Sequence, residues 1–181
     1  MTSLSPATAA SWIPDEEATD AHRELRAWCS EFRDLAAAMR LLGWDQQTKL
    51  PPKGQAGRGR TMGALNGVLH ERATSAELER LISNLEDVDP EGPEARVARR
   101  AFDQSTKFPA EHVRARVEAS SAGYAAWDAA RTNDDFAAFQ PHLEKLLELS
   151  RKDAEYLGYE NEPYDALHDL YEEGSRAADL E

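Results

Sequence analysis

Apolar residues recur at steps of three and four along almost the whole chain, which is the spacing of amphipathic α-helices. The first helix is predicted over about residues 20–42. Its apolar seam consists of Leu25, Trp28, Phe32, Leu35, Met39 and Leu42. A seam of this kind packs against a neighbouring helix. Gly43 predicts the end of this helix, because glycine favours a C-terminal cap, and Pro51 and Pro52 prevent its continuation.

The same pattern predicts six further helices. They are expected over about residues 55–72, 75–84, 90–107, 109–133, 141–158 and 163–172, with a short turn through 139 before the sixth. The letters TSAE at 74–77 predict a capping box, and Asp89 followed by Pro90 predicts the start of the fourth helix. Pro109 and Pro141 are each expected to open a helix. With no strand pattern and no repeat, the fold class is all-α, a multi-helix antiparallel bundle.

A last helical stretch is expected after Ser175, which is a good N-cap residue. It runs for only about two turns, too short to be stable alone, so the sequence reads as cut off. The expected organisation is a polar tail over 1–18, docked through Trp12 and Ile13, and one helical domain over 19–181.

Composition excludes several classes of function. Lys plus Arg number 21 and Asp plus Glu 34, so the formal charge is −13, which disfavours nucleic-acid binding. No apolar run reaches the length of a membrane span, and the first residues do not read as a secretory signal. The single cysteine, Cys29, cannot form an internal disulfide, which fits a reducing compartment. The expected location is therefore the cytoplasm, with neither nucleic acid nor membrane as a partner.

The stretch GQAGRGRT, residues 54–61, is one residue away from a phosphate-binding P-loop. A P-loop follows a buried strand and carries a lysine, whereas here a proline-rich turn precedes the stretch and an arginine takes the lysine position. Nucleotide binding is therefore disfavoured. The surrounding segment is nevertheless basic, and it is a candidate anion patch or else a solvated face that balances nearby carboxylates. Its basic residues are Lys49, Lys53, Arg58 and Arg60.

The sequence HERAT, which begins at His70 and Glu71, is one residue short of the zinc motif H-E-x-x-H, because Thr74 replaces the second histidine. The five histidines, at 22, 70, 112, 142 and 168, are nowhere spaced as neighbours on one helix. We therefore assign no metal ligand, no catalytic residue and no cofactor to this chain. His168, among acidic residues, is interpreted as a surface histidine.

Two short segments of the sequence, around residues 44–48 and 164–171, are interpreted as structural. Asp45 and Thr48 follow Gly43 closely and are expected to cap backbone amides, while Trp44 anchors the corner in the core. Near the C-terminus, Tyr164 and Tyr171 share a helical face with two leucines.

These two segments, together with others along the chain, resemble a known protein family. The segments LLGWDQQTKLPPKGQAGRGR, HERAT and FPAEHVRARVEASSAGYAAWDAAR, with YDALHDLYEEG near the end, resemble the N-terminal region of the Taq-type thermostable carboxypeptidase family. Leu50, His168 and Glu173 depart from the residues usual there. The family-motif positions, expected to be structural, are Trp44, Asp45, Thr48, Pro51, Arg58, His70, Glu71, Tyr164, Asp165, Asp169 and Tyr171.

The resemblance implies a lineage of cytoplasmic, all-helical, commonly dimeric zinc carboxypeptidases that bind peptides in a deep groove. It also implies that the H-E-x-x-H helix lies C-terminal to the residues present here, so zinc is expected only in full-length relatives. The N-terminal helices of such enzymes form a wall or lid of the groove, and that is the role transferred to this chain.

Three hypotheses remain open. In the first, the chain is a non-catalytic N-terminal domain that needs a metal-bearing remainder. In the second, it is a stand-alone binding or regulatory module that self-associates, docks on a full-length carboxypeptidase or holds peptides. In the third, which has little support, it is an independent hydrolase. The expected partners are a second copy of the chain, forming a homodimer, or a larger carboxypeptidase-related protein, with peptides as a further candidate.

Overall fold

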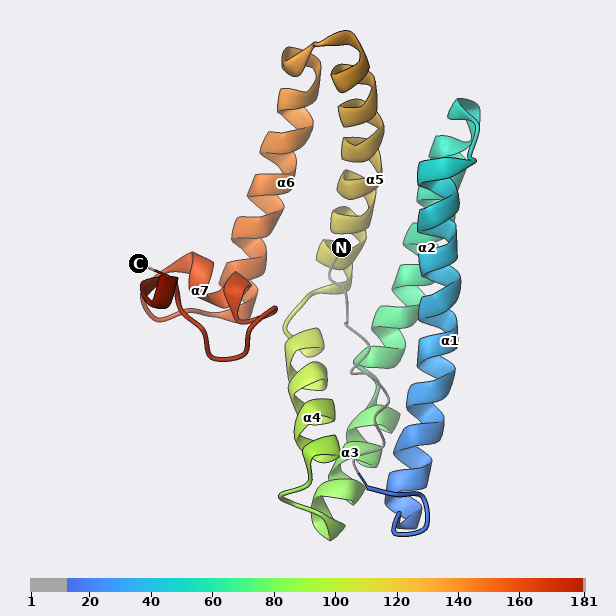
Figure 1. Ribbon diagram of the computed structural model, residues 1–181, viewed down its shortest axis with the longest axis vertical. Helices are drawn as coiled ribbons and strands as arrows, with labels where there is room; N and C mark the ends of the chain where they lie inside the picture. Colours follow the sequence, from blue (N-terminus) through green and yellow to red (C-terminus); the bar gives the residue numbers. More distant parts are fainter. Residues whose placement is uncertain (1–12, 181) are drawn as a thin grey trace. The chain divides into compact units, whose positions relative to one another are not determined.

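The computed structural model describes residues 13–180 of the chain, and this part is helical with no strand (Figure 1). The predicted all-α class is confirmed. The helices are α1 (Asp20–Thr48), α2 (Gln55–Ala73), α3 (Ala76–Val88), α4 (Pro93–Thr106), α5 (Ala110–Asn133), α6 (Phe136–Leu157) and α7 (Pro163–His168), with 3₁₀ turns η1 (Pro52–Gly54) and η2 (Ala177–Leu180). No helix in this range is both long and apolar enough to cross a membrane.

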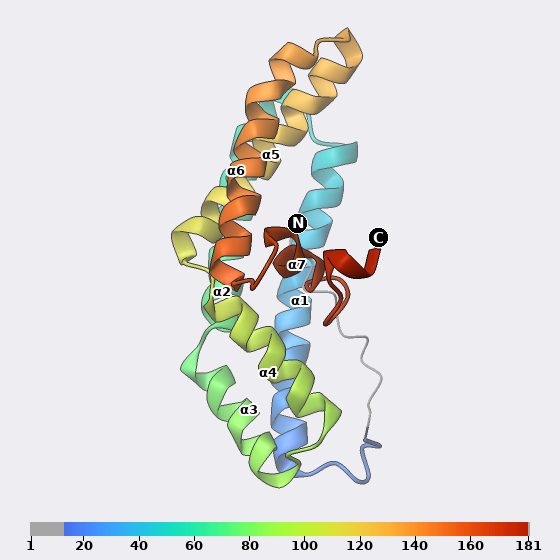
Figure 2. The same ribbon diagram turned by 90° about the vertical axis from the view of Figure 1, so that its left-hand side faces the viewer.

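The chain divides into two compact units, which meet in sequence between Thr106 and Lys107. The first unit contains α1 to α4, and the second contains α5, α6 and α7 with η2. Within the first unit α1 packs against α2 and α3, and α3 packs against α4; within the second, α6 packs against α5 and α7 (Figures 1 and 2). The predicted single domain over 19–181 stays a prediction. Residues 1–12 of the predicted tail, including Trp12, lie outside the described range.

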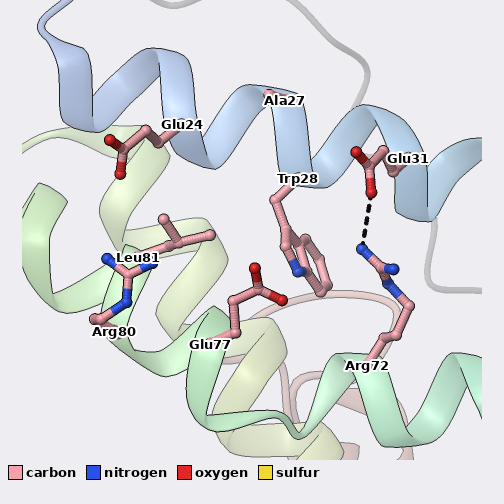
Figure 3. A pocket seen from close by; sticks show the side chains of 8 residues that line it. All are labelled: Glu24, Ala27, Trp28, Glu31, Arg72, Glu77, Arg80 and Leu81. Carbon is pink, nitrogen blue, oxygen red and sulfur yellow. Dashed lines mark hydrogen bonds and ion pairs between the residues drawn. The ribbon is translucent and has the colours of Figure 1, made fainter.

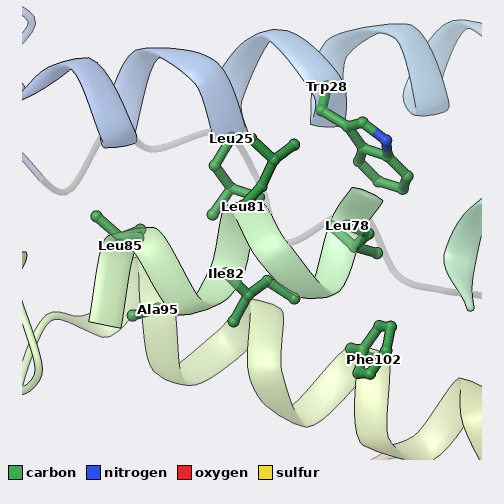
Figure 4. Close-up of a cluster of buried hydrophobic side chains, with 8 residues drawn as sticks. All are labelled: Leu25, Trp28, Leu78, Leu81, Ile82, Leu85, Ala95 and Phe102. Carbon is green, nitrogen blue, oxygen red and sulfur yellow. The ribbon is translucent and has the colours of Figure 1, made fainter. Parts of the chain in front are cut away.

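The core of the first unit lies where α3 is covered by α1 on one side and α4 on the other (Figure 4). Helix α3 contributes four leucine and isoleucine side chains at one helical face, and Ile82 and Leu85 are fully buried. The buried cluster comprises Leu25, Trp28, Leu78, Leu81, Ile82, Leu85, Ala95 and Phe102. The start of the predicted α1 seam therefore does pack as expected.

Arg26 ties the segment before α1 to the first unit. Its guanidinium donates to the carbonyl of Ile13 at 2.8 Å, to Asp15 at 2.7 Å and, from Nε, to Glu94 on α4 at 3.0 Å. Burial tends to raise the pKa of Glu94, but the hydrogen bonds and positive charge of Arg26 bring it below its ordinary value. The side chain thus holds α4 and the start of the described chain against α1.

In the second unit α5 and α6 form a long hairpin (Figure 1). A β-carbon at Gly123 would lie 3.1 Å from Leu146 Cδ1, so glycine permits the close approach. In the last turn of α6, Ala154 and Leu157 form a small core with Ala166 of α7. Lys107 donates to the carbonyl of Leu157 at 2.7 Å, which satisfies the end of α6.

Several predicted boundaries are wrong, beginning with α1. The helix continues through Gly43, which is not left-handed, and ends at Thr48; the amide of Lys49 donates to the carbonyl of Asp45 at 2.9 Å. Glycine permits a cap but does not impose one, and the two prolines that follow are what end the helix. In α3 the N-cap is Ser75, whose hydroxyl accepts from the amide of Leu78 at 3.2 Å.

Three further starts or ends also differ. Asp89 is the C-cap of α3, so α4 begins at Pro93 rather than Pro90. Helix α6 begins at Phe136 with Asp135 as its N-cap, and Pro141 lies within the helix, where it has no amide hydrogen to donate. Helix α7 ends at His168 rather than near 172, and the stretch after Ser175 is a 3₁₀ turn.

Replacing a core side chain of α3 tests the packing of the first unit. Leu85→Ala should lower the free energy of unfolding by about 2–5 kcal/mol, because it leaves a cavity between α1, α3 and α4. Val88→Ala, on the same helix but 56% exposed, is the matched control and should change it by less than about 0.5 kcal/mol. Urea unfolding followed by circular dichroism measures both, and equal effects would contradict the assigned core.

Candidate functional site

The first group of family-motif residues lies where α1 ends and α2 begins. Arg58 of α2 donates from Nη1 to the carbonyl of Leu42 and from Nη2 to Asp45 Oδ2, each at 2.6 Å. The Arg58 side chain is 16% exposed and that of Asp45 33%, so the ion pair is partly shielded from water. Arg58 therefore fastens the last turns of α1 to the first turns of α2.

The corner differs from the prediction in two respects. Thr48 donates to the carbonyl of Trp44 at 2.8 Å and Asp45 accepts from Arg58, so in neither contact does the side chain cap a backbone amide. Trp44 is 56% exposed and does not anchor the corner in the core. Because α1 continues without a break, the seam reaches Gln46, which is buried, and Trp44 falls on another face of the helix.

The predicted anion patch is altered by the same contacts. Arg58 already binds a carboxylate and a carbonyl, so it is not available as an anion ligand. Lys49, Lys53 and Arg60 are exposed, and as an anion site they stay a prediction. Pro51, also exposed, accepts from the amide of Gly54 at 2.8 Å in the turn that leads into α2.

His70 and Glu71 lie in the last turn of α2, at the opposite end of the helix from Arg58. Thr74, which replaces the second zinc-binding histidine of an H-E-x-x-H motif, donates to the carbonyl of His70 at 2.9 Å. The threonine thus completes the end of α2, and the carboxylate of Glu71 is exposed.

The remaining family-motif residues lie on α7 and just after it in the second unit, where Asp165 and Asp169 hold the following loop. Asp165 Oδ1 accepts from the amide of Ala177 at 2.7 Å, and Asp169 Oδ1 accepts from the amide of Gly174 at 2.9 Å. Gly174 adopts φ +81°, a conformation that favours glycine. Tyr164 and Tyr171 are 50% and 82% exposed, so the aromatic members point away from these contacts.

Sequence reasoning missed a buried polar network in the second unit. His112 Nε2 lies 2.6 Å from Asp153 Oδ1, and Arg116 Nη1 lies 2.9 Å from Asp153 Oδ2 and donates to Ser150 Oγ at 3.0 Å. Both His112 and Asp153 are buried, and the ring of Tyr156 meets His112 edge-on. The available signal was the spacing of four between His112 and Arg116, which places both on one face of α5.

The resemblance implies zinc only in full-length relatives, and the described residues offer no set of ligands for it. Within residues 13–180 no group of three or more histidine, cysteine or acidic side chains converges as metal ligands. Burial raises the pKa of the Cys29 thiol, which disfavours the thiolate that zinc binds.

The described residues form an all-helical framework in which Arg58, Asp165 and Asp169 hold a helix corner and a loop. A profile of the carboxypeptidase Taq (M32) metallopeptidase family matches residues 24–181. The chain is 38% identical over 151 residues to thermostable carboxypeptidase 1 of Pyrococcus furiosus, covering 81% of this chain and 30% of that protein. It is 32% identical over 177 residues to thermostable carboxypeptidase 1 of Thermus thermophilus, covering 88% and 34%.

Solved structures agree with the sequence matches. The fold superposes on the crystal structure titled BsuCP with a TM-score of 0.82 at 29% identity, covering 90% of this chain and 34% of that one. For the Pyrococcus furiosus carboxypeptidase the TM-score is 0.72 at 34% identity, covering 90% and 34%. The chain belongs to the carboxypeptidase Taq (M32) metallopeptidase family, as the resemblance predicted, and it spans about a third of the length of these relatives.

Removing Arg58 tests the first corner. Arg58→Ala should lower the free energy of unfolding by about 1–3 kcal/mol, because Asp45 and the Leu42 carbonyl lose a charged donor. Arg60→Ala, exposed on the same helix, is the control and should change it by less than about 0.5 kcal/mol. Urea unfolding distinguishes them; a neutral Arg58→Ala would contradict a stabilising role.

A second variant tests the buried network between α5 and α6. Asp153→Ala should lower the free energy of unfolding by about 3 kcal/mol, because Arg116 loses its counter-charge in a partly buried position. Glu155→Ala, exposed on the same helix, should have little effect. Hydrogen exchange of α5 and α6 amides provides the measurement, and equal protection in both variants would show that the network is dispensable.

Proposed function

We propose that this chain is a non-catalytic N-terminal domain of a metallocarboxypeptidase, forming one wall or lid of a peptide groove. The domain would act only together with a metal-bearing remainder. Membership of the family supports the proposal, as does the fact that the chain spans about a third of its relatives. Zinc chemistry is assigned to the remainder, since the described residues offer no ligand set for it.

The observation that carries the proposal is a division among the motif residues. The charged members Arg58, Asp165 and Asp169 are engaged in contacts within the chain that hold helix corners and a loop. The aromatic members Trp44 and Tyr171 are 56% and 82% exposed. The charged residues stabilise the domain itself, and the large aromatic residues stay on its surface. A groove wall that packs against another part of the protein needs both.

Exposed apolar side chains extend beyond the motif within each unit. In the first unit Leu41 and Val68 are 64% and 47% exposed, and in the second Phe136 and Tyr159 are 62% and 45% exposed. Scattered exposed apolar residues are ordinary, but these add to the motif aromatics in both units. Family membership favours a further part of the protein, about twice the size of this chain, as the surface that covers these exposed side chains.

The same exposed residues suit the alternative, a stand-alone module that self-associates or docks on a full-length carboxypeptidase. Self-association brings together two surfaces that each carry part of a formal charge of −13, and this repulsion opposes it. We therefore favour a carboxypeptidase-related remainder as the partner, with peptides bound at the joint groove. The cytoplasm is the proposed location, since Cys29 has no partner for an internal disulfide.

Exchange with a relative tests the proposal. This chain would replace the matched N-terminal third of carboxypeptidase 1 of Bacillus subtilis, and release of C-terminal residues from blocked dipeptides would be measured with added zinc or cobalt. The chain alone should release nothing, whereas the chimera should be active. Tyr171→Ser should weaken assembly about tenfold or more when the two parts are supplied separately, because it removes an exposed aromatic contact.

Val88→Ala, exposed on α3 and outside the motif, is the matched control and should assemble normally. Metal-dependent turnover by the chain alone would contradict a non-catalytic role. An inactive chimera, combined with a stable dimer of the chain in light scattering, would support the stand-alone module instead.

A further inference from the structure

One side of the α5–α6 hairpin is apolar. Gly123 and Leu146 mark where the two helices meet, because a β-carbon at Gly123 would lie 3.1 Å from Leu146 Cδ1. The helices have the same hand and run in opposite directions (Figure 1). The residue that follows each of these contact positions therefore turns toward the same side of the pair, which places Tyr124 and Leu147 on one side.

Steps of three and four residues from Tyr124 and Leu147 define this side of the hairpin, which we call the hairpin face. On α5 its positions are Val113, Val117, Ser120, Tyr124, Trp127 and Arg131. On α6 its positions are Phe136, Gln140, Leu143, Leu147, Ser150 and Ala154. Apolar and aromatic side chains predominate, and none of these positions carries a carboxylate.

A helix already covers one end of the hairpin face. Ala154 has no exposed area, and it packs in one cluster with Ala166 of α7. Earlier on the same stripe of α6, Leu147 is 48% exposed and Phe136 is 62% exposed, and Trp127 on α5 is 38% exposed. The stripe that is buried at its α7 end is therefore open to solvent for much of its remaining length.

The open surface of the first unit is of another kind. The hollow between α1, the last turn of α2 and the start of α3 is lined mainly by charged side chains, and Arg72 Nη2 donates to Glu31 Oε2 at 3.1 Å (Figure 3). Charged groups are stable in water, whereas exposed leucine and aromatic side chains gain free energy when another surface covers them. A covering partner is therefore expected at the hairpin face rather than at the hollow.

The spacing and charge of the hairpin face restrict what covers it. Stripes of side chains three and four residues apart fit the ridges of another helix, as α7 does at one end. Arg131 lies over the Trp127 ring, 5.3 Å from its centroid, and makes no ion pair within residues 13–180. An acidic side chain on the covering helix would pair with it. A second copy of the face offers an arginine and no carboxylate, so it does not supply this charge.

We propose that the hairpin face is the docking surface for a helix of the metal-bearing remainder. This helix carries an apolar stripe that covers Trp127, Leu147 and Phe136, and an acidic residue that pairs with Arg131. The inference rests on the proposed function, because the chain spans about a third of its matched relatives and the rest of their length is the source of the helix. It adds to that function the surface and the charge of the joint.

The test compares side-chain oxidation by hydroxyl radicals in the chain alone and in the chimera with carboxypeptidase 1 of Bacillus subtilis, measured by mass spectrometry. Oxidation of Trp127 and Leu147 should fall about fourfold or more in the chimera, because the core of an interface excludes water. Tyr156 is the matched control, since it is also 38% exposed. It follows Leu146 by ten residues, which turns it to the opposite side of the hairpin, so its oxidation should stay the same.

Removing the charge of Arg131 tests the acidic partner. Arg131→Gln should lower the thermal midpoint of the chimera, because the acidic residue of the docked helix loses its counter-charge. It should leave the midpoint of the chain alone unchanged, since Arg131 is exposed and makes no ion pair there. Arg151→Gln, exposed on α6 and outside the hairpin face, is the control and should leave both midpoints unchanged.

The outcomes separate this inference from the proposed function. Unchanged oxidation of Trp127 and Leu147 in an active chimera would overturn the docking surface and leave the proposed function intact, whereas in an inactive chimera it would overturn both. Protection of Tyr156 equal to that of Trp127 would overturn the assignment to this side of the hairpin. Protection that appears in the chain alone as its concentration rises would assign the face to a second copy instead. An unchanged midpoint in the Arg131→Gln chimera would overturn the acidic partner.

Discussion

Burial of the apolar face of α3 between α1 and α4 is the interaction on which the first unit depends. Ile82 and Leu85 reach zero exposure there, and Leu25 and Trp28 complete the layer from α1. An amphipathic helix has one apolar face, and it gains stability only when a neighbour covers that face. The contact fixes α1, which in turn sets where the corner with α2 and the Trp28 indole lie. The position of the corner motif is thus a consequence of this packed layer.

Polar contacts serve a different purpose in this chain. Arg26, Arg58 and Arg116 each join segments through carboxylates or carbonyls. Hydrogen bonds that tie helices together in a partly shielded setting add specificity to packing that is otherwise adjustable. This pattern fits a structural framework, in which Arg58, Asp165 and Asp169 hold a helix corner and a loop.

The exposed aromatic residues indicate which parts of the framework could contact further protein. Trp44 on α1 and Tyr171 after α7 are highly exposed, although they belong to the segments on which the predicted resemblance rests. Because solvent-exposed aromatic side chains contribute little to the stability of an isolated domain, their value lies in what they contact. In a chain that spans about a third of its relatives, the remaining two-thirds is the covering that we propose.

The sequence by itself determined the helical class, most helix positions, the acidic charge and the family, because each follows from local spacing or from motif order. It did not determine the end of α1: Gly43 allows a cap, but only the prolines beyond Thr48 impose the break. Nor could it show that Trp44 is exposed, or that His112 meets Asp153, 41 residues away on another helix. Burial and long-range hydrogen bonds depend on which faces of separate helices come together, and only the tertiary structure decides that.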